Sequence, residues 1–376
     1  MQDFQVYLLK ETGLGRFGMF KTGILALVLG FSGLQAAAQD IKFEQRISGL
    51  DTPWALAVLP DGAVLVTEID GQLLRFADGA ANMVSGTPQV VQNGQGGLLD
   101  ITPARDFATS RTLFFSYAKA LSGGSGTALA AAELSADGQR LENLRDLFVM
   151  SQGSGVGRHF GSRVVEGTDG TLFLTIGDRG DDVTAQDLSL HNGSVIRVNR
   201  DGTVPADNPF VGQTGALPEI WSYGHRNPQG AGLDLEGNLW VSEHGARGGD
   251  EVNQIKKGAN FGWPVISYGR HYSGRKIGEG TSKPGMEQPA TYWDPSIAPS
   301  GLLVHSGTTF PEWQGDMFVG SLKFDYISRL EGSPLREVEQ IKTKETLRVR
   351  DIVEAPDGAI WFISVGNGSV YRMTPD

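Results

Sequence analysis

Apolar and polar positions alternate along this chain in short runs, and one arrangement recurs. Each copy has an apolar run of strand length, a turn marked in most copies by an acidic residue and glycine, and a second run rich in β-branched and aromatic residues. The copies cover residues 55–67, 98–116, 164–176, 232–242, 302–320 and 351–363. Short runs separated by such turns predict β-hairpins, because glycine accepts the positive φ that a tight turn requires.

Six copies of one strand-turn-strand unit indicate a repeat architecture. A third strand follows many copies, for example at residues 72–76 and 369–372. Repeats of this kind are typical of propellers, in which each blade buries its faces against its neighbours. We therefore expect an all-β fold, a six-bladed β-propeller of four-stranded antiparallel blades. The early strand at residues 41–47 has no nearby hairpin partner, so we expect it to complete the last blade and remove an exposed edge.

The N-terminal residues follow a different pattern. Lys21 precedes an apolar run over residues 23–34, and alanines occupy positions 36–38. This order is typical of a signal peptide, and the run is too short to span a bilayer. We expect residues 1–38 to be an N-terminal extension and signal peptide, cleaved near Ala38, with translation starting at Met1 or Met19. The mature chain would then be periplasmic or secreted, with no membrane span.

No linker or change of composition divides residues 39–376, which we expect to form a single propeller domain; the alternatives are two β domains or a β-sandwich. The net charge of −11 disfavours nucleic acid as a partner, because phosphate binding needs an excess of lysine and arginine. The chain has no cysteine, which excludes thiol catalysis and cysteine-ligated zinc. P-loop, Gly-x-Ser-x-Gly and His-Glu-x-x-His motifs are also absent from the sequence.

Polar motifs interrupt the apolar strands at eight places. They lie at residues 95–99, 159–163, 176–178, 207–210, 219–264, 295–301, 321–323 and 348–351. In these motifs, and in their order, the chain resembles the soluble glucose dehydrogenase and aldose sugar dehydrogenase family, propellers that use pyrroloquinoline quinone (PQQ) and are grouped with sorbosone dehydrogenases. The resemblance extends over nearly the whole mature chain.

The resemblance implies a catalytic group. His159 would be the general base that removes the proton from the anomeric hydroxyl, a task that suits imidazole because its pKa is near the working pH. Asp178 would orient His159, and Arg226 would hold the charge that develops on the cofactor. Apart from Asp178, we expect the acidic run over residues 178–182 to be a solvated loop.

The resemblance also implies PQQ as the cofactor. PQQ carries three carboxylates and an ortho-quinone, so its pocket needs several cations in an otherwise acidic protein. The matching positions for cofactor binding are Gln95, His159, Arg226, Asn227, Lys323, Arg348 and Arg350. Arg348 and Arg350 lie two apart on an expected strand, so we predict that they share one face, with Val349 in the blade interior.

Calcium is the second cofactor that the resemblance implies. Gly245 and Ala246 match main-chain ligands of the cofactor-bound ion, and the family often has proline at the position of Ala246. Glu251 and the carbonyl of Phe261 match a second calcium position, where the family usually has tyrosine in place of Phe261. Calcium accepts backbone carbonyls among several oxygen ligands.

The implied reaction is oxidation of an aldose at C1 to the lactone, with a quinone or haem protein as the electron acceptor. Arg158 stands where the glucose-specialised branch has aspartate, so the preferred sugar stays open. The chain is shorter than that branch, and we expect a monomer. Two alternatives remain: a calcium-dependent propeller hydrolase resembling a lactonase, and a non-catalytic carbohydrate-binding propeller. The hydrolase would need several side-chain carboxylates around one ion.

Overall fold

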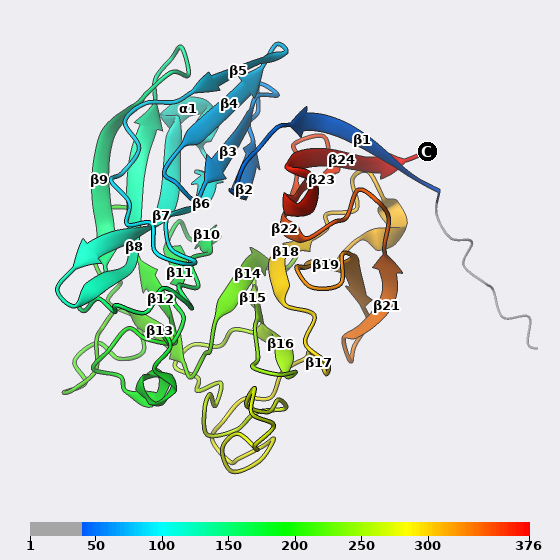
Figure 1. Ribbon diagram of the computed structural model, residues 1–376. Coiled ribbons are helices and arrows are strands. Elements are labelled where there is room, and N and C mark those ends of the chain that lie inside the picture. Colours follow the sequence, from blue (N-terminus) through cyan, green and yellow to red (C-terminus); the bar gives the residue numbers. More distant parts are fainter. Residues whose placement is uncertain (1–39) are drawn as a thin grey trace, which may run out of the picture. The chain divides into compact units, whose positions relative to one another are not determined.

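Six antiparallel sheets of four strands each are set around a common centre in the computed structural model, which describes residues 40–376 (Figure 1). The first three sheets consist of β2 (Pro53–Val58), β3 (Val64–Glu68), β4 (Leu73–Ala77) and β5 (Ala80–Met83); β6 (Leu98–Pro103), β7 (Thr112–Leu121), β8 (Gly124–Leu134) and β9 (Leu141–Val149); and β10 (Val164–Glu166), β11 (Leu172–Thr175), β12 (Ser194–Val198) and β13 (Ile220–Tyr223). The next two consist of β14 (Pro228–Leu233), β15 (Leu239–Glu243), β16 (Asp250–Gln254) and β17 (Thr291–Trp293); and β18 (Pro299–Val304), β19 (Met317–Ser321), β20 (Ile327–Glu331) and β21 (Arg336–Ile341). The predicted six-bladed propeller is confirmed. The predicted signal peptide lies outside the described residues.

The sixth sheet joins the two ends of the described chain. It contains β22 (Val349–Glu354), β23 (Ile360–Ser364) and β24 (Ser369–Pro375), and its outer strand is β1 (Ile41–Ser48). β1 pairs antiparallel with β24, with Ile41 opposite Pro375 and Ser48 opposite Ser369. Figure 1 shows these strands, blue and red, side by side. The predicted closure of the ring by the early strand is therefore confirmed.

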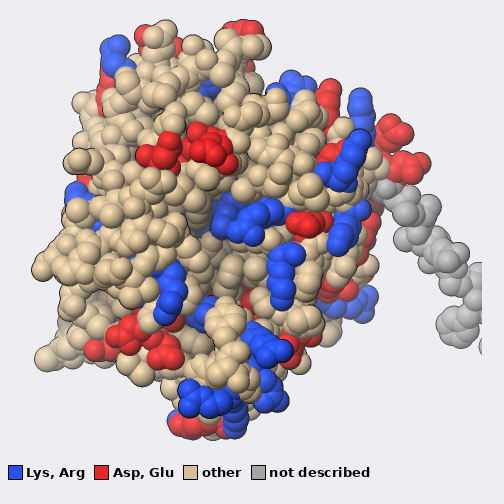
Figure 2. Space-filling model, viewed as in Figure 1, with Lys and Arg blue, Asp and Glu red and all other residues tan. Residues whose placement is uncertain are grey.

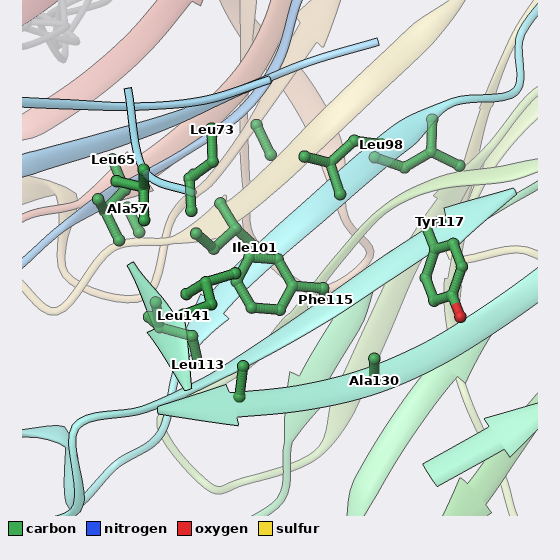
Figure 3. Close-up of a cluster of buried hydrophobic side chains, with 14 of the residues drawn as sticks. Ala57, Leu65, Leu73, Leu98, Ile101, Leu113, Phe115, Tyr117, Ala130 and Leu141 are labelled. Atoms are coloured by element: carbon green, nitrogen blue, oxygen red, sulfur yellow. The ribbon is translucent and has the colours of Figure 1, made fainter. Parts of the chain in front are cut away.

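Apolar side chains fill the spaces between neighbouring sheets. One cluster joins the first two sheets and includes Leu65, Leu73, Leu98 and Phe115, all of which are fully buried. In Figure 3 side chains from these two sheets point toward one another. Similar clusters lie between the other neighbouring pairs of sheets. Because each sheet buries both faces, hydrophobic packing holds the blades together. Side-chain hydrogen bonds between blades add to it, such as that from Thr67 Oγ1 to the Leu99 carbonyl at 2.6 Å.

The turns behave as the Asp-Gly pattern predicts. Between β2 and β3, Gly62 has φ +84°, and the Asp61 carboxylate accepts a hydrogen bond from the Ala63 amide at 3.0 Å. In the described part of the chain, helical structure is limited to α1 (Phe107–Ser110) and three short 3₁₀ turns, η1 (Asp182–Gln186), η2 (Pro311–Trp313) and η3 (Val365–Asn367). None of the helices between residues 40 and 376 is both long enough and apolar enough to cross a membrane.

The order of strands explains where polar residues collect. The first strands of the six sheets contact one another around the ring, and each pairs antiparallel with its second strand. The segment before a first strand and the segment after a second strand therefore lie at the same end of the ring. His159, Arg226 and Arg348 come from segments of the former kind, and Asp178 and Lys323 from segments of the latter kind. This end carries the candidate site.

Candidate active site

His159 and Asp178 form a hydrogen-bonded pair. His159 precedes β10 and Asp178 follows β11, and the two strands pair antiparallel, which brings their flanking segments together. His159 Nδ1 lies 2.6 Å from Asp178 Oδ1, and the side chains are 12% and 2% exposed. Gly180 N donates to Asp178 Oδ1 at 2.7 Å, and Trp263 Nε1 donates to Oδ2 at 2.9 Å. Three donors thus hold one carboxylate, which fixes its orientation.

The charges around the pair favour a neutral imidazole. Burial lowers the pKa of His159, and the Arg226 and Arg158 guanidinium groups add to this effect, while Asp178 opposes it. Burial would raise the pKa of Asp178, but its hydrogen bonds with His159 and Gly180 and the charge of Arg226 hold that pKa below its usual range. A carboxylate at Nδ1 selects the tautomer with the proton on Nδ1. Nε2 is then left as the basic atom.

Arg226 lies beside this pair and is held by the neighbouring blade. Its amide donates to Glu243 Oε2 at 2.8 Å, and its guanidinium donates to the carbonyl of Gly245 and lies 5.3 Å from the Trp263 ring centroid. A cavity of about 450 Å³ is bordered by His159, Arg226 and Trp263. The structure therefore brings the three predicted catalytic residues, His159, Asp178 and Arg226, to one cavity.

A second, larger cavity of about 1020 Å³ occupies the same end of the ring. The two cavities share three bordering residues, Gln95, Ala246 and Tyr272. The larger one contains most of the residues predicted to bind the cofactor: Gln95, Asn227, Lys323, Arg348 and Arg350. In Figure 2 lysine and arginine side chains border the hollow at the centre of the face shown. An acidic protein therefore has a locally basic cavity.

Four cations border this cavity, namely Lys323, Arg348, Arg350 and the exposed Arg247, and none of them has a carboxylate partner among residues 40–376. Arg348 donates to the Leu322 carbonyl at 3.1 Å, and Arg350 donates to Gln229 Oε1 at 2.8 Å. Lys323 lies 4.8 Å from the Phe324 ring centroid. Burial, with the charges of Arg163 and Arg348, lowers the pKa of Arg350 to about 9. Several cations without counter-charges in one cavity are arranged to bind an anion with more than one acidic group.

The structure corrects the expected strand position of Arg348. The strand β22 begins at Val349, and Arg348 precedes it with φ +51°, because its amide donates to Asp325 Oδ1 at 2.9 Å in a turn. A bulge between Val349 and Asp351 also breaks the alternation that the prediction assumed. Both arginines still border the same cavity, and Val349 is buried in the blade interior as expected.

The predicted calcium ligands lie on the loop after β15, on β16 and on the segment that follows β16. The Gly245 carbonyl accepts a hydrogen bond from Arg226, so a cation there would share that oxygen or displace the guanidinium. Ala246 borders both cavities. Among residues 40–376 no cluster of three or more histidine, aspartate or glutamate side chains is arranged to hold a metal. Each expected calcium position thus depends on main-chain carbonyls.

Glu251 and Phe261 offer the better fit to a cation. Asn253 Nδ2 donates to Glu251 Oε2 at 3.1 Å and to Glu243 Oε1 at 3.0 Å, which brings two carboxylates close together. Burial, with the charge of Glu243, raises the pKa of Glu251 to about 8. No hydrogen bond within the described chain reaches the Phe261 carbonyl, which borders a small cavity with both carboxylates. Two adjacent carboxylates beside an available carbonyl suit a hard cation.

Ser222, His225 and Glu243 have the hydrogen-bond order of a hydrolase triad. Ser222 Oγ lies 2.9 Å from His225 Nε2, and His225 Nδ1 lies 2.9 Å from Glu243 Oε1. The serine and histidine are fully buried, and His225 stacks on Phe261 at 4.6 Å between ring centroids. A serine that no substrate reaches is no nucleophile, so this group supports the packing of the site.

Sequence reasoning missed three residues of the site. Trp263 lies within a motif of the family resemblance, but its bond to Asp178 spans 85 residues and could not be anticipated from spacing. Tyr272 is 74% exposed at the border of both cavities, without a pattern that marks it. Arg179 belongs to the run expected to be a solvated loop. That expectation is wrong for Arg179, whose side chain is 1% exposed, whereas Asp181 of the same run is exposed.

The larger of the two cavities at this end is closed toward the opposite end of the ring. Arg163 Nη1 lies 2.9 Å from Asp100 Oδ1 and 2.7 Å from Asp351 Oδ1, and all three side chains are buried. A separate cavity of about 520 Å³ begins beyond this group and opens among the far ends of the first strands. The buried ion pairs therefore separate the candidate site from that opening.

Comparison with known proteins gives concordant results. A family profile described as Glucose / Sorbosone dehydrogenase matches residues 50–372. The aldose sugar dehydrogenase YliI of Escherichia coli is 39% identical over 362 residues, covering 94% of this chain and 98% of that protein. The apo-form crystal structure of the soluble aldose sugar dehydrogenase from E. coli has a TM-score of 0.85 at 38% identity, covering 89% of this chain and all of that one. The PQQ-bound form of an aldose sugar dehydrogenase from Streptomyces coelicolor has a TM-score of 0.73 at 25% identity, covering 91% of this chain and all of that one.

Proposed function

Since this chain belongs to the glucose / sorbosone dehydrogenase family, we propose that it oxidises aldose sugars at C1 to the lactone, with PQQ and Ca²⁺ as cofactors. One observation carries the proposal. A histidine held by a buried carboxylate lies next to a basic cavity whose cations have no carboxylate partners among residues 40–376. A base for the sugar hydroxyl and a receptor for a polyanionic cofactor are thus adjacent.

The larger cavity fits PQQ by the chemistry of its lining. Lys323, Arg348 and Arg350 would pair with the cofactor carboxylates, and Gln95 and Asn227 would donate to its polar edge. When bound, the quinone supplies the acceptor for the two electrons of the sugar. The ion pairs of Arg163 with Asp100 and Asp351 close the floor of the cavity and limit access of water from the far end of the ring.

His159 would handle the proton. With Nδ1–H donated to Asp178, Nε2 can accept the proton of the anomeric hydroxyl, and the imidazolium that forms stays paired with the carboxylate. The lowered pKa of His159 keeps the base unprotonated at neutral pH. Arg226 lies at the same cavity and would stabilise negative charge that develops on the bound cofactor.

Two calcium positions complete the proposal. Main-chain oxygens of Gly245 and Ala246 would hold the ion that serves the cofactor, with the hydrogen bond from Arg226 given up or shared. Glu251 and the Phe261 carbonyl would hold a second ion next to Glu243. The first ion would act as a Lewis acid toward the quinone, and the second would stabilise the loop that follows β16.

The remaining parts of the proposal concern the setting of the reaction. We infer export after cleavage of a signal peptide within residues 1–38, action as a monomer through one catalytic domain over residues 39–376, and electron transfer to a quinone or haem protein. The signal-peptide pattern and the family support these inferences.

Sugar-dependent dye reduction by the purified mature protein tests the proposal. PQQ and Ca²⁺ are added together, singly or not at all, with a set of aldoses as substrates. We expect activity only with both additions, its loss in His159→Ala even at saturating PQQ, and loss of PQQ binding in Lys323→Met. Lys344→Met, at a side chain that is 91% exposed, is the matched charge control. Absence of both PQQ binding and sugar oxidation would refute the proposal.

A further inference from the structure

Arg179 is a buried cation beside the candidate base that the proposed function leaves unexplained. It directly follows Asp178 and is 1% exposed. Within residues 40–376 no carboxylate oxygen lies within 4.0 Å of its guanidinium nitrogens. Burial lowers the pKa of Arg179 to about 10, with the charge of Asp178 acting in the opposite direction. A buried charge without an ion pair is costly, so its position requires a compensating role.

The guanidinium of Arg179 contacts the chain on both sides of His159. It donates to the carbonyl of Arg158, the residue before the base, and to the Val156 carbonyl at 3.1 Å. Its carbon atom lies 3.4 Å from the ring centroid of Phe160, the residue after the base. It also donates to the Ser125 carbonyl of β8 at 3.3 Å, which anchors the loop to the neighbouring blade.

The backbone that Arg179 holds has an unfavourable conformation. His159 has φ +57° and Arg179 itself has φ +56°, values in the left-handed region that residues with a Cβ rarely adopt. Such conformations persist only where several contacts fix them, and they cluster at active sites. Here the His159 amide also donates to Gln95 Oε1 at 2.8 Å. The base is thus held at its ring by Asp178 and at its backbone by Arg179 and Gln95.

We propose that Arg179 is a positioning residue, which fixes the backbone of residues 156–160 so that the His159 imidazole faces the cavity with Nδ1 on Asp178. Two consecutive residues then have complementary roles: Asp178 orients the imidazole ring, and Arg179 fixes the position of the backbone that carries it. The expected effect of Arg179 on kcat rests on the proposed function of His159 as the base. Its effect on the position of the imidazole is independent of that function. Displacement of a reacting group by about 1 Å costs roughly 100-fold in rate.

The variants Arg179→Gln and Arg179→Lys test the proposal. Lysine keeps the charge but cannot donate to several carbonyls while lying flat on Phe160. Arg197→Gln is the matched control, because Arg197 is also buried, belongs to β12 of the same sheet and lies 4.8 Å from the Trp221 ring centroid. Its partners are Asp169 and Asp207, away from the site.

The first readout separates positioning from folding. At saturating PQQ and Ca²⁺ we expect kcat of Arg179→Gln to fall about 10- to 100-fold with the Kd for PQQ within about threefold of wild type. Arg197→Gln should lower the thermal unfolding temperature and keep kcat. An Arg179→Gln protein that loses stability as the control does and keeps wild-type kcat would overturn the proposal.

The second readout needs no cofactor. The chain has six histidines, so ¹⁵N-histidine NMR with His159→Gln for assignment can follow the Nδ1–H proton that His159 donates to Asp178. We expect this signal in wild type and Arg197→Gln, and its shift or loss in Arg179→Gln. If Arg179→Gln does not fold, Arg179→Lys takes its place as the test variant. An unchanged Nδ1–H signal and an unchanged kcat in Arg179→Lys would refute the positioning role. If the wild-type protein shows the signal but no sugar oxidation, and Arg179→Gln loses the signal, the proposed function is refuted and the positioning role is supported.

Discussion

Replacement of Asp178 by asparagine removes one charge from the candidate site with almost no change in volume. Asp178 Oδ1 accepts from Gly180 N at 2.7 Å and faces His159 Nδ1 at 2.6 Å, and Oδ2 accepts from Trp263 Nε1 at 2.9 Å. Gly180 and Trp263 can only donate. An asparagine has one oxygen for these three neighbours, so its NH₂ group must face a donor.

Two arrangements of the asparagine follow. If its NH₂ group faces Trp263, one buried N–H loses its acceptor, which costs about 1–3 kcal/mol of unfolding free energy. If it faces His159, it also faces Gly180, whose N–H then loses its acceptor. The imidazole becomes the acceptor at Nδ1 and carries its proton on Nε2. That tautomer cannot take a proton from the sugar. General base catalysis contributes about 10²- to 10⁴-fold, so we expect kcat to fall by this factor, or about 3–5 kcal/mol of barrier.

The assay is dye reduction at saturating PQQ, Ca²⁺ and sugar from pH 5 to 9, with a PQQ titration and thermal unfolding of the same samples. Since Asp178 raises the pKa of His159 against the effect of burial, its loss should lower that pKa further. The acidic limb of the residual pH profile should therefore move to lower pH. Asp169→Asn, at a side chain that is 52% exposed before β11, is the control and should keep kcat.

The reasoning is refuted if Asp178→Asn binds PQQ as wild type does and keeps kcat within about threefold, since an essential base would lose at least 100-fold. A loss of kcat that Asp169→Asn shares would point to a general effect of charge in this blade. Loss of PQQ affinity alone would place Asp178 in cofactor binding.

Three further predictions concern the cofactor, a calcium position and the core. Arg350→Met should weaken PQQ binding about 10- to 100-fold in a fluorescence titration, yet leave the apoprotein as stable as wild type or more so, because burial already lowers the pKa of this arginine to about 9; a less stable apoprotein would contradict this. The pKa of Glu251, raised to about 8 by burial and by Glu243, exceeds its unfolded value, so its stabilising contribution without calcium is full below pH about 4.5 and is lost as pH rises toward 8. In urea unfolding without calcium, the unfolding free energy of the wild type should fall from pH 5 to 8, and that of Glu251→Gln should not. Calcium should reverse this trend in the wild type. Parallel pH profiles of the two proteins would contradict the prediction. Phe115→Ala, in the fully buried cluster of Figure 3, should lower the unfolding free energy by about 3–5 kcal/mol, whereas Leu144→Ala, at a side chain that is 39% exposed, should have little effect in the same urea experiment; equal losses would contradict the packing argument.

Local sequence was sufficient for the hairpin strands and for the number of sheets, but it did not locate the outer strands of the first five sheets. Apolar runs of strand length and Asp-Gly turns are short-range signals, and six copies of them require six sheets. The unpaired run at residues 41–47 also carried enough information to identify it as the closing strand, since β1 pairs with β24. Motif order was sufficient for the family, which the match over residues 50–372 confirms.

Local sequence was less informative where backbone and burial depart from the simple period. Arg348 and Arg350 were expected to share a strand face. Both border one cavity, but they do so because Arg348 has a positive φ before β22 and a bulge follows at Val349. Arg179 stands in an acidic run, and its composition indicates a solvated loop. Its burial follows from contacts with residue 125 of the neighbouring blade and with residues 156, 158 and 160 of the segment before β10, none of which is close to it in sequence.

The sequence by itself determined that this protein is a closed ring of six hairpin-based sheets, and its motifs predicted, through the family resemblance, a basic, histidine-containing site. Only the tertiary structure decided which side chains meet there, such as Trp263 with Asp178 and Arg179 with the loop of His159. The physical reason is the range of the forces. Apart from β1 with β24, hydrogen-bonded strands are neighbours in sequence. The centre of the ring is instead assembled by packing of apolar faces between sheets, and the distances across it depend on all six sheets at once.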